Sequence, residues 1–353
     1  MKLKTLAIAV AALALLAGIG LLAKWKLGAP AAAGRVGQPV MGALDMTQAA
    51  RIELVGPASR TTLIAQPAGW TVQEQGGFPA DQGKLNTFLL KLAEQKIADT
   101  VSDNPADFGD LGVLTVAENG NKAEERKTGT LFRILDGSGK PLYQLLIGRD
   151  RSQSMTVSAY GGQYVRFPQD KAALLIGTAL YAETDPKEWL DKAILPAAAE
   201  KNFRSIRVER PGAKLLTFSR KQADSPWEMD GGTPRGLNAQ EIDNLSKKLR
   251  DLQVGQIAPA GGTPASLGRA KLGVVEAHTF DGRTWRLDVG ELKGADNYRY
   301  ATVRETLDGS VSDAAQKKQA EAFNEKFKGR VFGIPDWDAS RLFHERKEYL
   351  QSK

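Results

Sequence analysis

Histidine and cysteine, the residues that most often hold metals or act as nucleophiles, are scarce in this chain. Cysteine is absent, and the two histidines are His278 and His344. His278 lies in a predicted strand just before an Asp-Gly turn, and His344 lies in a charged segment near the C-terminus. The pair lacks the spacing of a zinc site, and no thiolate is available as a ligand or nucleophile. We therefore predict no metal site, and we expect His278 to have a structural or surface role.

The glycine-rich segment Gly137-Ser138-Gly139-Lys140 comes closest to a phosphate-binding loop. A true loop of this type has a longer Gly-x-x-x-x-Gly-Lys motif, followed by Ser or Thr, between a strand and a helix. Here Pro141 follows the lysine and strands are predicted on both sides, so we predict a turn. The Gly-x-Ser-x-Gly motif that would indicate a hydrolase does not occur in the sequence.

Paired carboxylates could perform acid–base chemistry, as they do in glycosidases. The candidates are Asp336 with Asp338 and Asp185 with Asp191. Such pairs must face one another across a cleft, and closeness in sequence does not provide that arrangement. We expect these residues to cap helices or to lie on solvated surfaces. We therefore predict no catalytic residue, no cofactor site and no enzymatic activity.

Tryptophans and basic residues could form two other kinds of binding surface. Exposed tryptophans make platforms for sugars, but three of them lie in predicted strands with hydrophobic neighbours, which favours burial: Trp70, Trp227 and Trp285. Lys247, Lys248 and Arg250 lie on the polar side of a predicted amphipathic helix, as is typical of a solvated helix face. No recognition motif indicates nucleic-acid binding, and we predict none.

The N-terminus has the pattern of a membrane anchor. Lys2 and Lys4 precede a run of apolar or small residues over positions 5–23, and Lys24-Trp25-Lys26 closes it. As a helix this run would span about 28 Å at roughly 1.5 Å per residue, close to the hydrocarbon thickness of a bilayer. A tryptophan between lysines suits the headgroup region. We predict that residues 1–26 anchor the chain in the membrane.

A cleavable signal peptide is the alternative, because Ala31-Ala32-Ala33 satisfies a small-residue cleavage rule. That site lies far beyond the end of the apolar run, which favours a retained anchor. We expect a cytoplasmic start and a body in the periplasm or outside the cell, held by the inner (cytoplasmic) membrane. The formal net charge of +7 suits an anionic surface or polymer, although a broadly solvated basic surface accounts for it more simply.

The remainder of the chain predicts two tandem α+β repeats of mainly antiparallel sheet, each with a packed helix. A Gly-, Ala- and Pro-rich linker over 27–45 precedes a first repeat over 46–195 and a second over 196–310. Residues 311–353 are predicted as a helical extension, with one charged helix over 313–328 and another at the end. The repeats share an order of short strands, a tryptophan, a helix, an Asp-Gly hairpin and a glycine.

Each repeat has one clear helix and one clear hairpin. In the first, Asp81 is the predicted N-cap of a helix carrying Leu85, Phe88, Leu89, Leu92 and Ile97 on a helical period. In the second, Leu237-Asn238-Ala239 opens a predicted helix whose apolar face carries Ile242, Leu245, Leu249 and Leu252. The turns Asp136-Gly137 and Asp281-Gly282 each separate two alternating apolar runs, which predicts β-hairpins. The segment from Glu188 to Lys192 is predicted to link the two repeats.

Several short motifs occur together in the order expected for one bacterial family. They are Pro79-Ala80-Asp81, Phe108-Gly109-Asp110-Leu111, Leu145-Leu146-Ile147-Gly148, Tyr164-Val165-Arg166 and Trp189-Leu190-Asp191-Lys192. With the tryptophan-bearing strand before them, these motifs resemble the bacterial domain-of-unknown-function 4340 family over roughly residues 50–340. The second repeat departs from the pattern, since Leu237-Asn238-Ala239 stands in place of Pro-Ala-Asp.

This resemblance implies a single-pass membrane protein with no assigned catalytic residue. Such proteins are often encoded beside ATP-binding-cassette (ABC) transport systems and gliding-motility-like auxiliary subunits. We therefore expect a non-enzymatic accessory subunit of such an envelope system, with the membrane (through residues 5–23) and ABC-type transporter subunits as its partners. The alternative is a binding module for an anionic envelope polymer or small ligand, held in a groove between the repeats.

Overall fold

A computed structural model describes residues 34–122, 124–151, 161–197, 199–231, 236–258, 271–291 and 297–351. The predicted anchor at residues 5–23, the first part of the predicted linker and the alanines at 31–33 lie outside these residues. Among the residues that are described, no helix is both long enough and apolar enough to cross a membrane.

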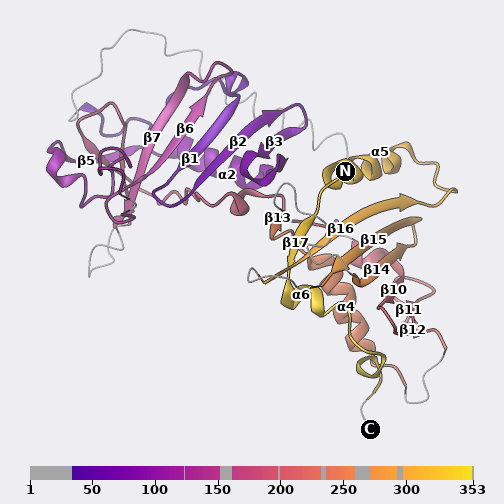
Figure 1. The fold of residues 1–353 in the computed structure, drawn as a ribbon. Helices are drawn as coiled ribbons and strands as arrows, with labels where there is room; N and C mark the ends of the chain where they lie inside the picture. Colours follow the sequence, from indigo (N-terminus) through magenta and orange to yellow (C-terminus); the bar gives the residue numbers. More distant parts are fainter. Residues whose placement is uncertain are drawn as a thin grey trace. The chain divides into compact units, whose positions relative to one another are not determined.

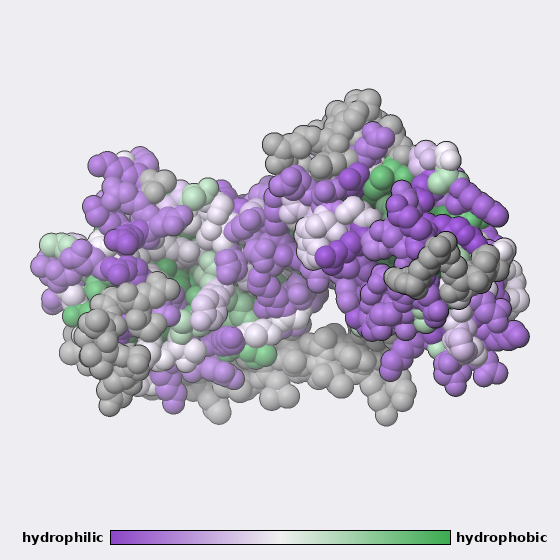
Figure 2. All heavy atoms as spheres, turned by 90° about the horizontal axis from the view of Figure 1, so that it is seen from below, coloured by the Kyte–Doolittle hydropathy of each residue, from purple (hydrophilic) through white to green (hydrophobic). Residues whose placement is uncertain are grey.

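The chain divides into two compact units, Met1–Leu190 and Asp191–Lys353. Each unit contains one antiparallel sheet and few helices, so the chain has a mixed α and β architecture (Figure 1). On the face drawn in Figure 2, hydrophilic residues cover most of the described surface and hydrophobic residues show only in small patches.

The first sheet has nine strands in the order β4-β3-β2-β1-β6-β7-β8-β9-β5. Its strands are β1 (Arg51–Val55), β2 (Arg60–Gln66), β3 (Gly69–Val72), β4 (Phe78–Pro79), β5 (Ile97–Ser102), β6 (Thr130–Leu135), β7 (Pro141–Asp150), β8 (Gln163–Arg166) and β9 (Ala173–Ile176). Short 3-10 turns η3 (Met46–Gln48), η4 (Gln73–Gln75) and η5 (Pro105–Asp107) connect some of them. The alternation of β1 buries Ile52 and Leu54 on the face that forms the core.

The helix of the first unit, α2 (Gln82–Glu94), covers that apolar face. Asp81 caps it by accepting a 2.9 Å hydrogen bond from the Lys84 amide, as predicted. Leu85, Phe88 and Leu92 are buried, and the Phe88 ring meets Phe132 of β6 edge-on at 5.2 Å. The helix ends at Glu94, so the prediction that placed Ile97 on its face is wrong. Ile97 begins the edge strand β5 instead.

The second sheet has eight strands in the order β12-β11-β10-β14-β15-β16-β17-β13. Its strands are β10 (Phe203–Glu209), β11 (Leu216–Ser219), β12 (Glu228–Met229), β13 (Gln256–Ile257), β14 (Lys271–Thr279), β15 (Arg283–Gly290), β16 (Tyr298–Leu307) and β17 (Phe332–Pro335). Its helices are α3 (Ala199–Asn202), α4 (Ala239–Asp251), α5 (Ala314–Phe327) and α6 (Asp336–Ser340). The predicted helix over 313–328 is thus α5, with Asp313 as its cap.

The two sheets have one topology. Strands β1 to β3 occupy the places of β10 to β12, strands β6 to β9 occupy those of β14 to β17, and β4 alone has no counterpart. In both units the strand that follows the main helix, β5 or β13, joins the far edge of the sheet. The common order is what a duplication would produce, and the duplication itself stays a prediction.

Each unit closes with the same 3-10 turn, η7 (Pro186–Trp189) or η8 (Arg346–Tyr349). The carbonyl of Trp189 accepts from the Asp81 amide at 2.8 Å, and that of Tyr349 accepts from the Asn238 amide at 2.9 Å. The aromatic side chain of the turn is fully buried in both units. Each turn therefore ties the end of its unit to the N-cap of its main helix, and we call it the closing turn.

The closing turns show that two segments predicted to lie outside the folded units are parts of them. Residues 188–190, predicted as a link between repeats, carry the buried Trp189 and belong to the first unit. Residues 311–353, predicted as a helical extension, supply the strand β17 and the closing turn of the second unit. A second charged helix was predicted at the end of the chain, but the helical elements described after β17 are the short α6 and the 3-10 turn η8.

Part of the predicted linker packs on the first unit. Arg35 pairs with Asp170 and lies over the Phe167 ring. The Gly37 amide donates to the Ile97 carbonyl at 2.7 Å, and Val40 is buried. Residues 35–40 thus extend the edge of the sheet beside β5, and they are attached to the unit rather than free of it.

Candidate functional site

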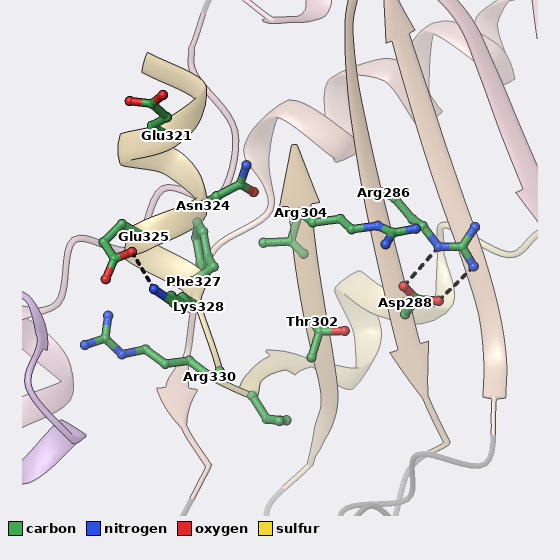
Figure 3. Close-up of a pocket in the computed structure, with 13 residues that line it drawn as sticks. Arg286, Asp288, Thr302, Arg304, Glu321, Asn324, Glu325, Phe327, Lys328 and Arg330 are labelled. Atoms are coloured by element: carbon green, nitrogen blue, oxygen red, sulfur yellow. Dashed lines mark hydrogen bonds and ion pairs between the residues drawn. The ribbon is translucent and has the colours of Figure 1, made fainter. Parts of the chain in front are cut away.

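An open groove of about 930 Å³ lies in the second unit. It lies between the exposed face of β15 and β16 and the C-terminal part of α5 (Figure 3). Its polar lining comprises Arg286, Asp288, Thr302, Arg304, Glu321, Asn324, Glu325, Lys328 and Arg330. Phe327 and Val303 supply an apolar part, and the Phe327 ring points toward β16.

The groove exists because α5 occupies the place where another strand would pair. Strand β17 pairs only with residues 298–301 of β16, which leaves the rest of that edge open. Asn324 of α5 accepts from the Glu305 amide at 2.9 Å and donates to the Glu305 carbonyl at 2.8 Å. The helix therefore satisfies the edge backbone without continuing the sheet, and it stands beside the exposed face.

A row of charged residues crosses the exposed face of this sheet. Cross-strand pairing places Arg207 beside Glu276, Glu276 beside Arg286, and Arg286 beside Arg304. The Arg286 guanidinium donates to Glu276 at 2.7 Å and to both oxygens of Asp288 at 3.1 and 3.2 Å. Like charges directly opposite one another on neighbouring strands are unfavourable. The two acids therefore balance Arg286, and Arg304 stands beside it.

Arg304 is exposed and has no hydrogen-bond or ion-pair partner among the residues that the structure describes. Figure 3 shows its side chain extended along the groove toward Arg286. Hydrogen bonds from Arg286 to Asp288 raise the pKa of Arg286 above its ordinary value, so this group stays charged. Arg286 and Arg304 thus lie side by side on neighbouring strands, and the N–H groups of Arg304 can donate to a bound ligand.

The other cations of the groove come from the end of α5. Lys328 is 74% exposed and pairs with Glu325 at 3.3 Å. The Arg330 guanidinium donates to the Lys326 carbonyl at 2.6 Å, and burial lowers the pKa of Arg330 while Glu325 opposes that shift. The arrangement can bind oxygen acceptors such as carboxylate, sulfate or phosphate groups, because guanidinium donors match their geometry.

Nothing in the groove indicates covalent chemistry or a metal. No group of three or more His, Asp or Glu residues with metal-binding geometry occurs in the described part of the chain. His278, the histidine nearest the charged row, lies on the same face, with Nδ1 at 2.9 Å from the Thr284 hydroxyl. Burial, reinforced by Arg207, lowers the pKa of His278, so the ring is neutral at pH 7.

The acids considered as catalytic pairs are engaged elsewhere. Asp185 caps η7 through the Lys187 amide at 2.9 Å, Asp191 pairs with Lys326 at 2.7 Å, Asp338 pairs with Lys248 at 2.6 Å, and Asp336 pairs with Arg299. Asp185 is a cap and the Asp191 side chain is 44% exposed, as expected. Asp336 and Asp338 instead form partly covered ion pairs, so the expectation of caps or solvated surfaces is wrong for these two. No two of them share the groove.

The remaining candidates have structural places. The segment 137–140 turns between β6 and β7, with the Asp136 carboxylate accepting from the Ser138 and Lys140 amides at 2.9 Å. Trp227 and Trp285 are buried, as expected, whereas Trp70 is only partly covered. Of the three basic residues of α4, Lys248 and Arg250 form ion pairs, and Lys247 is exposed. His344 and these lysines line a second, smaller cavity.

Sequence reasoning missed Arg286 and Arg304. Both were visible as the polar positions of alternating strands, but the register that sets them side by side depends on a hairpin and on the strand that follows it. The sequence contained no signal that α5 would stop short of covering them.

Fold and groove together define a two-unit, antiparallel-sheet protein with an arginine-containing polar groove and no catalytic constellation among its described residues. A family model described as a domain of unknown function (DUF4340) matches residues 70–274. The match covers more than half of the chain, and the chain belongs to this family. It runs from β3 to β14, so the groove lies beyond the matched segment. No curated protein and no solved structure matches the chain.

Proposed function

We propose that this chain is a membrane-anchored, non-enzymatic accessory protein whose second unit binds an anionic ligand in the groove beside α5. The observation that carries the proposal is the exposed Arg304 guanidinium, which lies next to Arg286 in a groove of about 930 Å³ and has no partner in the part of the chain that the structure describes. This groove lies within the second unit and differs from the groove between the repeats that the sequence predicts as a ligand site. Binding between the repeats stays a prediction.

The shape and charge of the groove favour an extended ligand. It is open, and its cations are spread from β15 to the end of α5 rather than gathered at one point. Three acids also line it, so its net charge is small, and attraction must come from local contacts rather than from a strong field. An anionic envelope polymer could make several such contacts along the groove.

The test is binding of short polyphosphate and of a sulfated oligosaccharide to the full-length protein in detergent. Arg304→Gln removes the cation and keeps a polar side chain, and we expect about tenfold weaker binding, the size of one charge-assisted hydrogen bond. Arg126→Gln, an exposed arginine of the first unit, is the matched control. Equal affinities of the wild type and Arg304→Gln would refute a ligand in this groove.

The accessory role is proposed on the family membership and on the predicted anchor. A protein tethered at one end, with no catalytic constellation among its described residues, suits a subunit that recruits or positions other components, such as an ABC-type transporter or a gliding-motility-like envelope system. Affinity purification from membranes, with a C-terminal tag, would identify partners and the N-terminus of the chain. Repeated purification without any envelope or transporter subunit would count against this role.

A further inference from the structure

A second cavity in the second unit, of about 450 Å³, lies over α4 at the closing turn η8. It shares no lining residue with the groove beside α5. Its lining comprises Glu241, Asn244, Leu245, Lys247, Lys248, Asp251, Arg341, His344 and Tyr349. We call it the α4 cavity.

In the first unit the corresponding place is filled. Trp189 of the closing turn meets the Phe88 ring of α2 at 5.9 Å. The Lys84 ammonium lies 5.2 Å from the Trp189 ring centre and donates to the Glu188 carbonyl at 2.8 Å. Aromatic packing and one lysine thus seal the space between the main helix and the closing turn.

In the second unit the same three positions are different. Counting from the N-caps, Leu245 takes the place of Phe88, Glu241 takes that of Lys84, and the closing turn carries Tyr349 instead of tryptophan. Leucine and tyrosine are smaller than the side chains they replace, and glutamate cannot cover the ring as the lysine does. The α4 cavity is the space that these changes leave.

Not all charged side chains that line the α4 cavity are paired with another residue. Lys248 and Asp251 are paired with Asp338 and Arg250. By contrast, the side chains of Lys247, Arg341 and Glu241 have no hydrogen-bond or ion-pair partner within the described ranges. Cations therefore exceed anions among the unpaired groups, and the imidazole of His344 adds a further polar group.

The Tyr349 hydroxyl is a second observation that points to a ligand site. Tyr349 is fully buried, and its hydroxyl has no hydrogen-bond partner in the described structure. Its counterpart Trp189 is satisfied, since Nε1 donates to the Glu183 carbonyl at 2.8 Å. Buried polar groups are rarely left unpaired in native proteins, and each exception calls for an explanation such as a bound ligand.

We propose that the α4 cavity binds a small oxygen-rich anion, a carboxylate or phosphate compound, with Arg341 and Lys247 as its cationic contacts and the Tyr349 hydroxyl as a donor. A site of this volume is within the range of small-molecule pockets. Arg341 also lies 5.5 Å from the ring centre of Trp337, which is 59% exposed, so an aromatic side chain borders the site.

The two histidines make the test direct, because each reports on a different site. His344 lines the α4 cavity, and His278 lies beside Glu276, which binds Arg286 of the groove. In full-length protein labelled at histidine, inorganic phosphate and succinate are titrated at constant pH and ionic strength while both imidazole signals are followed by NMR. We expect a saturable shift of His344 with one of these anions, independent of any movement of His278.

Three variants decide the result. Arg341→Gln should weaken the His344 response at least about tenfold. The double variant Leu245→Phe, Tyr349→Trp copies the first unit and should abolish the response by filling the cavity. Lys221→Gln, an exposed lysine of the same unit, should change nothing. If the double variant does not fold, Arg341→Gln alone decides.

The proposal is overturned if His344 does not respond to either anion, or if its response is unchanged in Arg341→Gln. A response of His278 without one of His344 would also overturn it, while leaving the groove proposal intact. Preference for a small cation such as ethylenediammonium would show that Glu241, and not the basic residues, determines the ligand. That outcome refutes an anion site.

Discussion

Replacing Tyr349 with alanine should destabilise the second unit by about 3 kcal/mol. A buried aromatic side chain removes about 150–250 Å² from water. At about 25 cal/mol per Å² this contributes about 4–6 kcal/mol, which is an upper bound because unfolded chains already bury some area. Tyr349 is 0% exposed, and its hydroxyl lacks a partner in the described structure, a defect that costs about 1–3 kcal/mol. Alanine at this position removes both the stabilisation from burying the ring and the cost of the unpaired hydroxyl, which leaves a net loss of about 3 kcal/mol.

The assay is urea unfolding of the full-length protein in detergent, followed by hydrogen exchange and mass spectrometry. Peptides from the two units report on each separately, so one experiment shows which unit has lost stability. The loss for Tyr349→Ala should fall on peptides of 191–351, including those of α4, because the Tyr349 carbonyl holds the Asn238 amide at 2.9 Å.

Tyr349→Phe sharpens the test, because it removes only the hydroxyl and should stabilise the unit by about 1 kcal/mol. The corresponding change in the first unit has the opposite sign. Trp189→Phe loses the bond to the Glu183 carbonyl and part of the packed volume, and should destabilise that unit by about 2 kcal/mol. The reasoning is refuted if Tyr349→Phe costs as much as Tyr349→Ala.

Three further changes test other parts of the structure. The Glu53 carboxylate is 2% exposed and pairs with Arg60 and Arg133. Glu53→Gln should lower the free energy of unfolding, measured in urea, by about 2 kcal/mol, which is less than for a fully buried ion pair because the arginines are partly solvated. Burial raises the pKa of the Glu305 carboxyl, so this group keeps its proton in the native state at pH values where it has lost it in the unfolded state. The free energy of unfolding should therefore fall as pH rises from about 4.5, and Glu305→Gln should make it less dependent on pH. Asn324→Ala should expose the edge of β16, lower stability by about 1–3 kcal/mol and raise the tendency to associate in light scattering.

The hairpins and the two main helices could be predicted from sequence because their signals are local. The Asp136-Gly137 and Asp281-Gly282 turns lie between strands that pair as expected. The cap at Asp81 and the apolar spacing after it gave the start of α2. Its end was misjudged, because Ile97 keeps the helical spacing and only its place at the far edge of the sheet makes it a strand.

The closing turns could not be predicted because their two parts are far apart in sequence. A short 3-10 turn has no periodicity to detect, and its role appears only when Trp189 reaches Asp81, or Tyr349 reaches Asn238. The same limit applies to Arg304. Its importance depends on the strand register that brings it to Arg286 and on the helix that stops beside it.

A comparison of the exposed faces explains why the second unit is the better candidate for binding an anion. In the first unit the row is centred on Glu53, whose carboxylate is surrounded by Arg51, Arg60 and Arg133, so the charges are satisfied within the unit. In the second unit the same central position is Arg207, the next is Glu276, and the row ends at Arg304, which has no ion-pair partner among the described residues. The same sheet topology therefore carries a charge cluster that is neutralised internally in the first unit. In the second unit it carries an arginine, Arg304, that we propose as the contact for a ligand.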